Sequence, residues 1–212
     1  VQFLADPMGQ FFSGDGWTIY GGLIGGFLGL WWYTRKYRIA FLPFLDAIAP
    51  AMMFAYGVGR QGCHLAGDGD WGIVAAAQPE WWFLPDWLWA YDYPRNVLNR
   101  GVEMVDCAGK YCHHLVPPVY PTPVYETLMA FTIGGILWAL RKRLTPMPGM
   151  LFALYVLFNG MERFVIEGIR VNPEHEALGG LTQAEFIALL LILTGTVMSG
   201  YFWRKYRKAG LP

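Results

Sequence analysis

The sequence predicts an all-α membrane protein with about five transmembrane helices and one long segment outside the membrane. The chain is 55% hydrophobic but only 15% charged, whereas a soluble domain usually has about 25% charged residues. Helices that cross a bilayer need about 17–25 apolar residues. Five apolar runs come near that length, at 19–34, 41–59, 123–140, 149–166 and 183–203.

Basic residues cluster directly after the first, third and fifth apolar runs, at 35–38, 141–143 and 204–208. If the chain crosses the membrane at every run, all three clusters lie on one side, which the positive-inside rule makes cytoplasmic. The alternative is a soluble helical protein whose runs form a core. The last run has no charged residue from Phe186 to Phe202, and a soluble protein would have difficulty covering five such helices.

The crossing pattern predicts a multi-pass membrane protein with a cytoplasmic C-terminus and divides the chain into four parts. Residues 1–18 form an extracytoplasmic N-terminal segment, and residues 19–60 form two transmembrane helices. Residues 61–122 form an extracytoplasmic aromatic-rich segment, and residues 123–212 form three transmembrane helices with a basic cytoplasmic tail. The aromatic density of the third part suits the headgroup layer of a bilayer. The formal net charge is zero, so nothing favours a nucleic-acid partner.

Two cysteines of the aromatic-rich segment, Cys107 and Cys112, are five residues apart. Outside the cytoplasm of a bacterium, a disulfide is the simplest interpretation. The alternative is a zinc site that adds His113 and His114, but the spacing matches no common zinc motif. Cys63 is left over as a potentially free thiol.

Charged residues gather at the predicted outer ends of the helices. Arg60 lies in a glycine-rich stretch at 57–72, and glycine lets a backbone approach a ligand closely. Helical spacing puts Asn159, Arg163, Glu167 and Arg170 on one face. An Arg163–Glu167 pair that is only structural is the alternative, but charges in membrane spans are costly and usually functional.

Arginines beside carboxylates at a membrane surface predict a site for a phospholipid headgroup, because guanidinium groups bind phosphate bidentately and stay charged. The sequence has no Gly-x-Ser-x-Gly elbow, P-loop or His-Glu-x-x-His motif. No cofactor and no metal are expected. The predicted charged set is Arg60, Asp68, Glu126, Arg163, Glu167 and Arg170.

Two predictions concern helix ends. Asp46 lies near the cytoplasmic end of the second run, where we expect it to pair with a nearby base. Thr182 is followed three residues later by Glu185. This spacing is typical of a capping box, in which the two side chains satisfy backbone N–H groups at a helix start.

Four segments, in order along nearly the whole chain, resemble motifs of the bacterial prolipoprotein diacylglyceryl transferase family. Members of that family usually have seven spans, so we expect this chain to begin after the first two. The segments are Tyr20-Gly-Gly-Leu-Ile-Gly, Gly59-Arg60-Gln-Gly62 through Gly67-Asp68, Tyr120-Pro-Thr-Pro-Val-Tyr-Glu126, and Arg163-Phe-Val-Ile-Glu167-Gly-Ile-Arg170.

The resemblance implies transfer of the diacylglyceryl group of phosphatidylglycerol to the lipobox cysteine of a prolipoprotein. It also implies that the protein lies in the bacterial cytoplasmic (inner) membrane, with its site facing the periplasm or exterior. The implied partners are that phospholipid, the prolipoprotein signal peptide with its lipobox, and membrane lipids. Arg60 and Arg163 would stabilise the departing phosphate, and Tyr20, which stands where the family has His, or His64 would serve as base. The implied substrate-binding residues are Asp68, Tyr125, Glu126, Asn159, Glu167, Arg170, Gly62 and Gly67.

The chain also departs from the family pattern, and it looks like a divergent member. Its signature has Cys63 and Ala66 where the family has Asn, and Asp68 where the family has Glu. One extra residue precedes Trp71-Gly72. A tyrosine is a poor base near neutral pH, so Tyr125 is a further candidate beside His64. The alternative function is therefore a non-catalytic lipid-binding or structural subunit of a membrane complex.

Overall fold

The computed structural model of the chain describes residues 19–170 and 181–208. Within this part, only the backbone of residues 19, 20 and 23 is described, not their side chains. The chain forms two compact units, Val1–Phe44 and Leu45–Pro212. In the first unit, α3 (Ile19–Lys36) occupies the first predicted span and ends in Arg35 and Lys36. The predicted N-terminal segment 1–18 and the side chain of Tyr20 lie outside the described residues.

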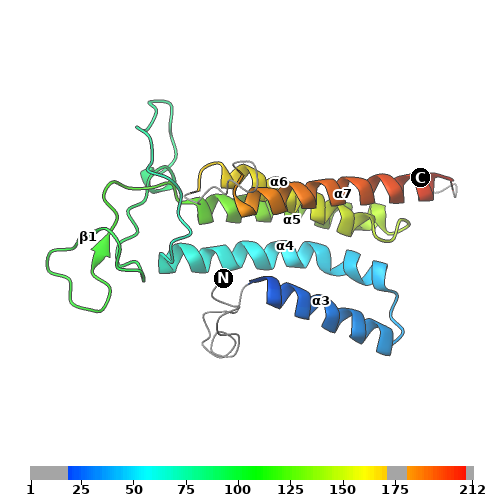
Figure 1. Ribbon diagram of the computed structural model, residues 1–212. Helices are drawn as coiled ribbons and strands as arrows, with labels where there is room; N and C mark the ends of the chain where they lie inside the picture. The colour runs from blue at the N-terminus through cyan, green and yellow to red at the C-terminus, as the bar shows by residue number, and fades with distance from the viewer. Residues whose placement is uncertain (1–18, 171–180, 209–212) are drawn as a thin grey trace. The chain divides into compact units, whose positions relative to one another are not determined.

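The second unit is built on four helices that run alongside one another (Figure 1). They are α4 (Phe41–Ala66), α5 (Thr122–Leu144), α6 (Met150–Glu167) and α7 (Gln183–Lys208). The first residues of α4 belong to the first unit. Buried Met53, Ala130, Leu137 and Leu151 form the core between α4, α5 and α6. The helices α6 and α7 meet through Gly160 and Gly195, at which a β-carbon would come within 3 Å of the facing helix's backbone. Small residues that bring backbones together are typical of membrane helix pairs.

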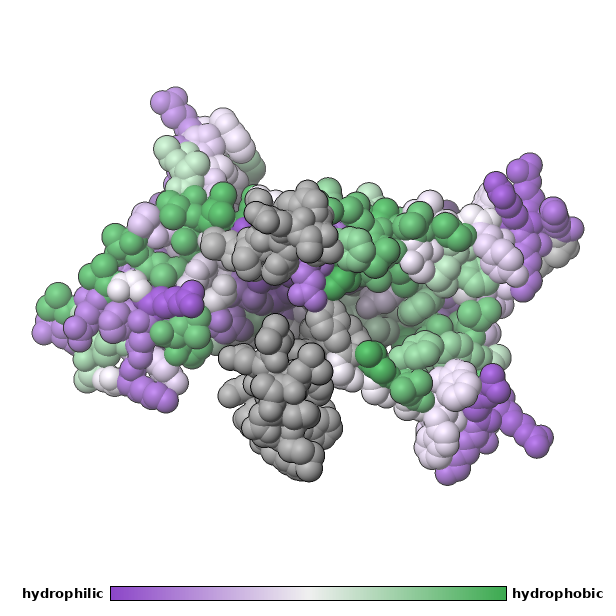
Figure 2. Space-filling view, viewed as in Figure 1, coloured by the Kyte–Doolittle hydropathy of each residue, from purple (hydrophilic) through white to green (hydrophobic). Residues whose placement is uncertain are grey.

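The described part of the chain is mostly helical, as predicted, and three of its helices are long and apolar enough to cross a membrane. These are α4, α5 and α7. The predicted spans at 19–34 and 149–166 form α3 and α6, but neither belongs to that set. Hydrophobic residues cover much of the visible helix surface, and hydrophilic residues gather where α7 ends (Figure 2).

The capping-box prediction at the start of α7 is confirmed. The Glu185 carboxylate accepts a hydrogen bond from the Thr182 backbone N–H at 2.8 Å, and the Thr182 hydroxyl accepts one from the Glu185 N–H at 3.1 Å. The prediction for Asp46 is wrong. Its carboxylate accepts the backbone N–H groups of Gly149 and Phe152 at 2.6 and 2.8 Å, because the start of α6 leaves N–H groups without helical partners.

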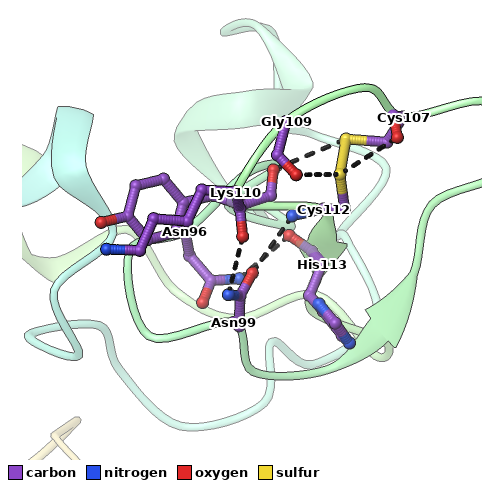
Figure 3. Close-up of a disulfide and its surroundings, with 8 residues drawn as sticks. Asn96, Asn99, Cys107, Gly109, Lys110, Cys112 and His113 are labelled. Carbon is purple, nitrogen blue, oxygen red and sulfur yellow. Dashed lines mark hydrogen bonds between the residues drawn. A yellow bond between two sulfur atoms is a disulfide. The ribbon is translucent and has the colours of Figure 1, made fainter.

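Between α4 and α5 the chain has little regular structure. It contains the short 3₁₀-helix η1 (Asp86–Leu88) and an antiparallel pair of strands, β1 (Val102–Glu103) and β2 (His113–His114). The structure joins Cys107 to Cys112 in a disulfide beside these strands (Figure 3). Zinc binds cysteine as the thiolate. Because Cys107 and Cys112 are joined in a disulfide, neither can serve as a ligand of the alternative zinc site. Buried Asn96 donates hydrogen bonds to the Arg100 and His113 carbonyls at 2.9 and 3.1 Å.

Backbone hydrogen bonds attach the start of this segment to two helix ends. The Gly72 N–H donates to the Tyr120 carbonyl, just before α5, and the Ile73 N–H donates to the Ile169 carbonyl, just after α6, both at 2.9 Å. A β-carbon at Gly72 would lie 2.7 Å from that Ile169 oxygen, so the close approach requires glycine. This attachment fixes the position of the residues just before Gly72.

Candidate functional site

Three arginines and three carboxylates come together where α4 and α6 end and α5 begins. We call them the arginine–carboxylate cluster: Arg60, Arg163, Arg170, Asp70, Glu126 and Glu167. The basic residues in the last turns of α5 and α7 lie at the other end of these helices (Figure 1).

Glu126, in the second turn of α5, is the centre of the cluster. Its side chain is fully buried and contacts all three arginines. It pairs with Arg60, and its Oε1 lies 3.6 Å from Arg163 Nη1 and 3.4 Å from Arg170 Nη1. A buried carboxylate is costly unless it is paired, and here three guanidinium groups from three parts of the chain surround it.

Asp70 bridges two of the arginines. One carboxylate oxygen pairs with Arg60 and the other with Arg170, and its backbone carbonyl accepts a 2.6 Å hydrogen bond from the Thr122 hydroxyl. Burial alone would raise the pKa of Asp70, but Arg170 and Arg60 outweigh it and hold that pKa below its usual value. Asp70 is therefore ionised at neutral pH, and it ties the segment after α4 to the end of α6.

Asp68, which the sequence analysis placed in the site, is exposed and lies beside the cluster. Its Oδ1 accepts the Asp70 backbone N–H at 3.3 Å. The structure puts Asp70 rather than Asp68 between the arginines. The extra residue before Trp71-Gly72 was the available signal, because it means that counting forwards from Arg60 does not decide which of the two aspartates takes the acidic position.

Arg163 is the most open of the three arginines. Its side chain is 25% exposed, against 14% for Arg60 and 8% for Arg170. It pairs with Glu167 at 3.3 Å, as the i,i+4 spacing predicts. Because its guanidinium group is the most exposed of the three and its contacts with Glu126 and Glu167 are no shorter than 3.3 Å, Arg163 is the arginine best placed to turn towards a ligand.

The remaining members of the predicted 159–170 stripe have different surroundings. Glu167 also accepts a 2.8 Å hydrogen bond from the Thr182 hydroxyl, and the Asn159 amide lies 3.9 Å from Met53 Sδ. The helix α6 ends at Glu167, so Arg170 is not on its face as predicted. Arg170 reaches the cluster from the turn that follows, where its N–H bonds to the Glu167 carbonyl at 3.1 Å.

Half-buried Tyr56 and buried Glu162 form a pair beside Arg60 that was not predicted from the sequence. Arg60 Nε lies 3.2 Å from the Tyr56 hydroxyl, and that hydroxyl donates to Glu162 Oε1 at 3.3 Å. Glu162 is only 2% exposed. Tyr56 precedes Arg60 by one helical turn, a signal the sequence contains. Glu162 is on α6, 106 positions from Tyr56, and no local pattern joins the two.

Two of the predicted bases are engaged elsewhere among the described residues. His64 Nδ1 lies 3.3 Å from the Tyr93 hydroxyl, and the His64 ring packs against Tyr91 and Tyr93. Burial raises the pKa of Tyr93, so its hydroxyl stays protonated at neutral pH. The Tyr125 hydroxyl donates to the Leu88 carbonyl at 2.6 Å. These contacts join each side chain to the segment between α4 and α5 rather than to the arginines.

The predicted glycines differ in their surroundings. Gly67 ends α4 with a positive φ of 59°, and a β-carbon there would meet Asn96 at 2.7 Å, so this residue makes the turn out of the helix. A β-carbon at Gly62 would meet nothing within 4 Å among the described residues. The sequence analysis assigned both glycines to substrate binding, and Gly62 is the one with open space around it.

Cys63, Asp68 and Asp70 bring possible metal ligands within 4.8 Å of one another. The Arg60 guanidinium already pairs with Asp70 and lies 3.8 Å from Cys63 Sγ. A cation would have to displace this positive group, so the chemistry of the donor set favours an anion at the cluster.

Known proteins of one family resemble this chain. A profile of the family described as prolipoprotein diacylglyceryl transferase matches residues 4–201. Among curated proteins, the phosphatidylglycerol–prolipoprotein diacylglyceryl transferase of Dehalococcoides mccartyi is 29% identical over 203 residues, which cover 95% of this chain and 67% of that protein.

Two further relatives have the same name. The protein of Clostridium tetani is 30% identical over 185 residues, or 86% of this chain and 62% of its own length. The protein of Stenotrophomonas maltophilia is 29% identical over 210 residues, or 93% of this chain and 65% of its own length. The chain thus spans about two thirds of the length of the curated relatives it matches. With the profile matching almost from end to end, the chain belongs to the prolipoprotein diacylglyceryl transferase family.

Proposed function

We propose that this protein transfers the diacylglyceryl group of phosphatidylglycerol to the lipobox cysteine thiol of a prolipoprotein, at the outer face of the bacterial cytoplasmic membrane. The observation that supports this best is the arginine–carboxylate cluster at one end of membrane-type helices. Relatives of this chain are named for the same reaction.

The arginines would bind the phosphate of the lipid. Arg60 and Arg170 are fixed by Asp70 and Glu126, and Arg163 is more open. The two fixed guanidinium groups preorganise the positive charge, and Arg163 closes on the phosphate. Because these groups stay charged and present several donors, they suit a phosphodiester headgroup.

In the transfer step, the acceptor thiol loses its proton and the thiolate attacks the glyceryl carbon that bears the phosphate. A carbon–sulfur bond forms, the carbon–oxygen bond to phosphate breaks, and glycerol phosphate leaves with the electron pair. Arg60 and Arg163 stabilise the negative charge that grows on the leaving phosphate. Glu126, Asp70 and Glu167 hold these arginines in place.

Tyr20, His64 and Tyr125 are the proposed proton acceptors for the thiol. His64 is the only one of the three whose ordinary pKa is near neutrality. We therefore place it first. Packing against Tyr91 and Tyr93 holds its ring at the end of α4.

We also propose the finer topology. The helices α3 and α6 cross the membrane together with α4, α5 and α7. The cluster and the segment 67–121 then face the periplasm or exterior, and the C-terminus is cytoplasmic. The basic residues that end α5 and α7 support this orientation.

A transfer assay tests the function. The protein in nanodiscs containing phosphatidylglycerol is mixed with a lipobox peptide, and the peptide mass is followed. We expect diacylglyceryl addition by the wild type and by Arg95→Ala, a matched control at an exposed arginine outside the cluster. We expect loss of addition with Arg60→Ala and Arg163→Ala. Undiminished transfer by either cluster variant would refute the proposed site, and failure of the folded wild type would favour a lipid-binding subunit.

A further inference from the structure

The segment between α4 and α5 divides into two parts with different surroundings. The aromatic loop, residues 76–89, extends sideways from the ends of the helices in Figure 1, whereas the part with β1 continues along the helix direction. We call this second part, residues 96–115, the disulfide lobe. Both belong to the second compact unit, so their different directions are a property of one body.

The aromatic loop exposes large apolar side chains. Trp81 is 71% exposed, Phe83 86%, and Trp87 and Leu84 more than 40%. Exposure of so many large apolar side chains to water on one loop is unfavourable, and such surfaces usually contact a membrane or another protein. Tryptophan and phenylalanine at the end of a membrane helix suit the boundary between headgroups and acyl chains.

Hydrogen bonds fix the base of the loop at the first turns of α5. The Tyr125 hydroxyl donates to the Leu88 carbonyl at 2.6 Å, and the Ala76 N–H donates to the Tyr120 hydroxyl at 3.2 Å. The Trp89 indole closes the base by donating to the Ala76 carbonyl at 2.8 Å. The loop therefore cannot move away from the end of α5 without breaking these contacts.

The level of that attachment corresponds to the membrane boundary. The helix α5 has 23 residues and is apolar enough to cross a bilayer. At about 1.5 Å per residue it covers roughly the 30 Å of a hydrocarbon core, so its first turn lies where acyl chains meet headgroups. A loop that leaves sideways at this level runs along the bilayer surface.

We propose that the aromatic loop inserts Trp81, Phe83 and Trp87 into the outer leaflet, whereas the disulfide lobe stands in water. No lysine or arginine lies between Arg60 and Arg95, and the loop contains Glu80 and Asp86. The attraction is therefore apolar rather than a contact between basic residues and anionic lipid. The partner is the bilayer interface, and the proposal does not depend on the transferase activity.

A spin label compares two sites of nearly equal exposure. Phe83 in the loop is 86% exposed and Val105 in the disulfide lobe is 89% exposed. Each is replaced in turn by p-acetylphenylalanine, which is coupled to a nitroxide. This chemistry leaves Cys63 and the Cys107–Cys112 disulfide unchanged. Because neither side chain is packed in the core, both labelled proteins should fold, which the circular dichroism of the helices checks.

The measurement is power saturation in nanodiscs with dissolved oxygen and with a water-soluble nickel chelate. We expect the label at 83 to be oxygen-accessible and several-fold less accessible to nickel than the label at 105. The difference should persist in purely zwitterionic lipid and at high salt, because the insertion is apolar. Equal nickel accessibility would overturn the proposal, and so would a label at 83 that neither reagent reaches, which would indicate a protein partner.

Discussion

The Tyr56 hydroxyl donates a hydrogen bond to Glu162 Oε1 across 3.3 Å and so joins α4 to α6 beneath the site. The same hydroxyl lies 3.2 Å from Arg60 Nε. The orientation of Arg60 therefore depends in part on a buried carboxylate of another helix.

Replacing Tyr56 with phenylalanine should lower both stability and turnover. It leaves Glu162, only 2% exposed, without its hydrogen-bond donor, which costs about 1–3 kcal/mol. It also removes one of the three groups that hold the Arg60 side chain, the other two being Asp70 and Glu126, so we expect kcat to fall more than KM rises. Thermal unfolding in detergent and the transfer assay measure the two effects. Tyr155→Phe is the matched control, because the Tyr155 hydroxyl has no hydrogen bond within the described residues. An equal loss in both variants would contradict the role of the hydroxyl.

The two aspartates that follow α4 should behave differently. Asp70→Asn removes the charge that bridges Arg60 and Arg170, and we expect a fall in kcat/KM of roughly 10²-fold. Asp68→Asn changes an exposed carboxylate outside the bridge and should have a much smaller effect. Kinetics of the two variants on the same lipobox peptide decide the matter. If Asp68→Asn proved the more damaging, the assignment of the bridging carboxylate would be wrong.

The contribution of Asp70 to stability should depend on pH with a defined sign. Its pKa is lowered in the folded protein from the ordinary value of 3.8, because Arg170 and Arg60 outweigh its burial. A lowered pKa adds stability that is fully present above the ordinary value and is lost as pH falls through the folded value. The difference in unfolding free energy between wild type and Asp70→Asn should thus be constant from neutral pH to about pH 5 and shrink below about pH 4. A difference that grew in acid would contradict the ion pairing.

Arg163 and Arg170 should separate ligand binding from stability. Arg163 is 25% exposed and Arg170 only 8%, so Arg163→Lys should weaken transfer with little change in the melting temperature. Arg170→Lys should reduce both, because lysine cannot reproduce the paired contacts of a buried guanidinium group. Nanodisc kinetics and thermal unfolding are compared with Arg95→Lys at an exposed site. Equal destabilisation by Arg163→Lys and Arg170→Lys would count against this division.

Local patterns in the sequence predicted the parts of this structure that depend on neighbouring residues. Apolar runs predicted the helices, the i,i+4 spacing predicted the Arg163–Glu167 pair, and Thr182 with Glu185 predicted the cap of α7. Each contact joins residues within one turn, where helix geometry alone sets the distance.

Contacts between distant parts of the chain were not predictable in this way. Glu162 meets Tyr56 across 106 positions, and Asp46 caps α6 from α4 across 103 positions. The choice between Asp68 and Asp70 depends on how Gly72 and Ile73 bond to the ends of α5 and α6. These contacts follow from how the helices pack in three dimensions, and spacing patterns along the chain do not specify that packing.

The most direct test of the central claim follows the mass of one lipoprotein in living cells. The complete gene that encodes this chain is expressed in a bacterium depleted of its own prolipoprotein diacylglyceryl transferase, and the N-terminal lipobox peptide is weighed. We expect a diacylglyceryl increment on the cysteine with the wild type and none with Arg163→Ala. A wild-type protein that reaches the membrane, folds and adds no increment would contradict it.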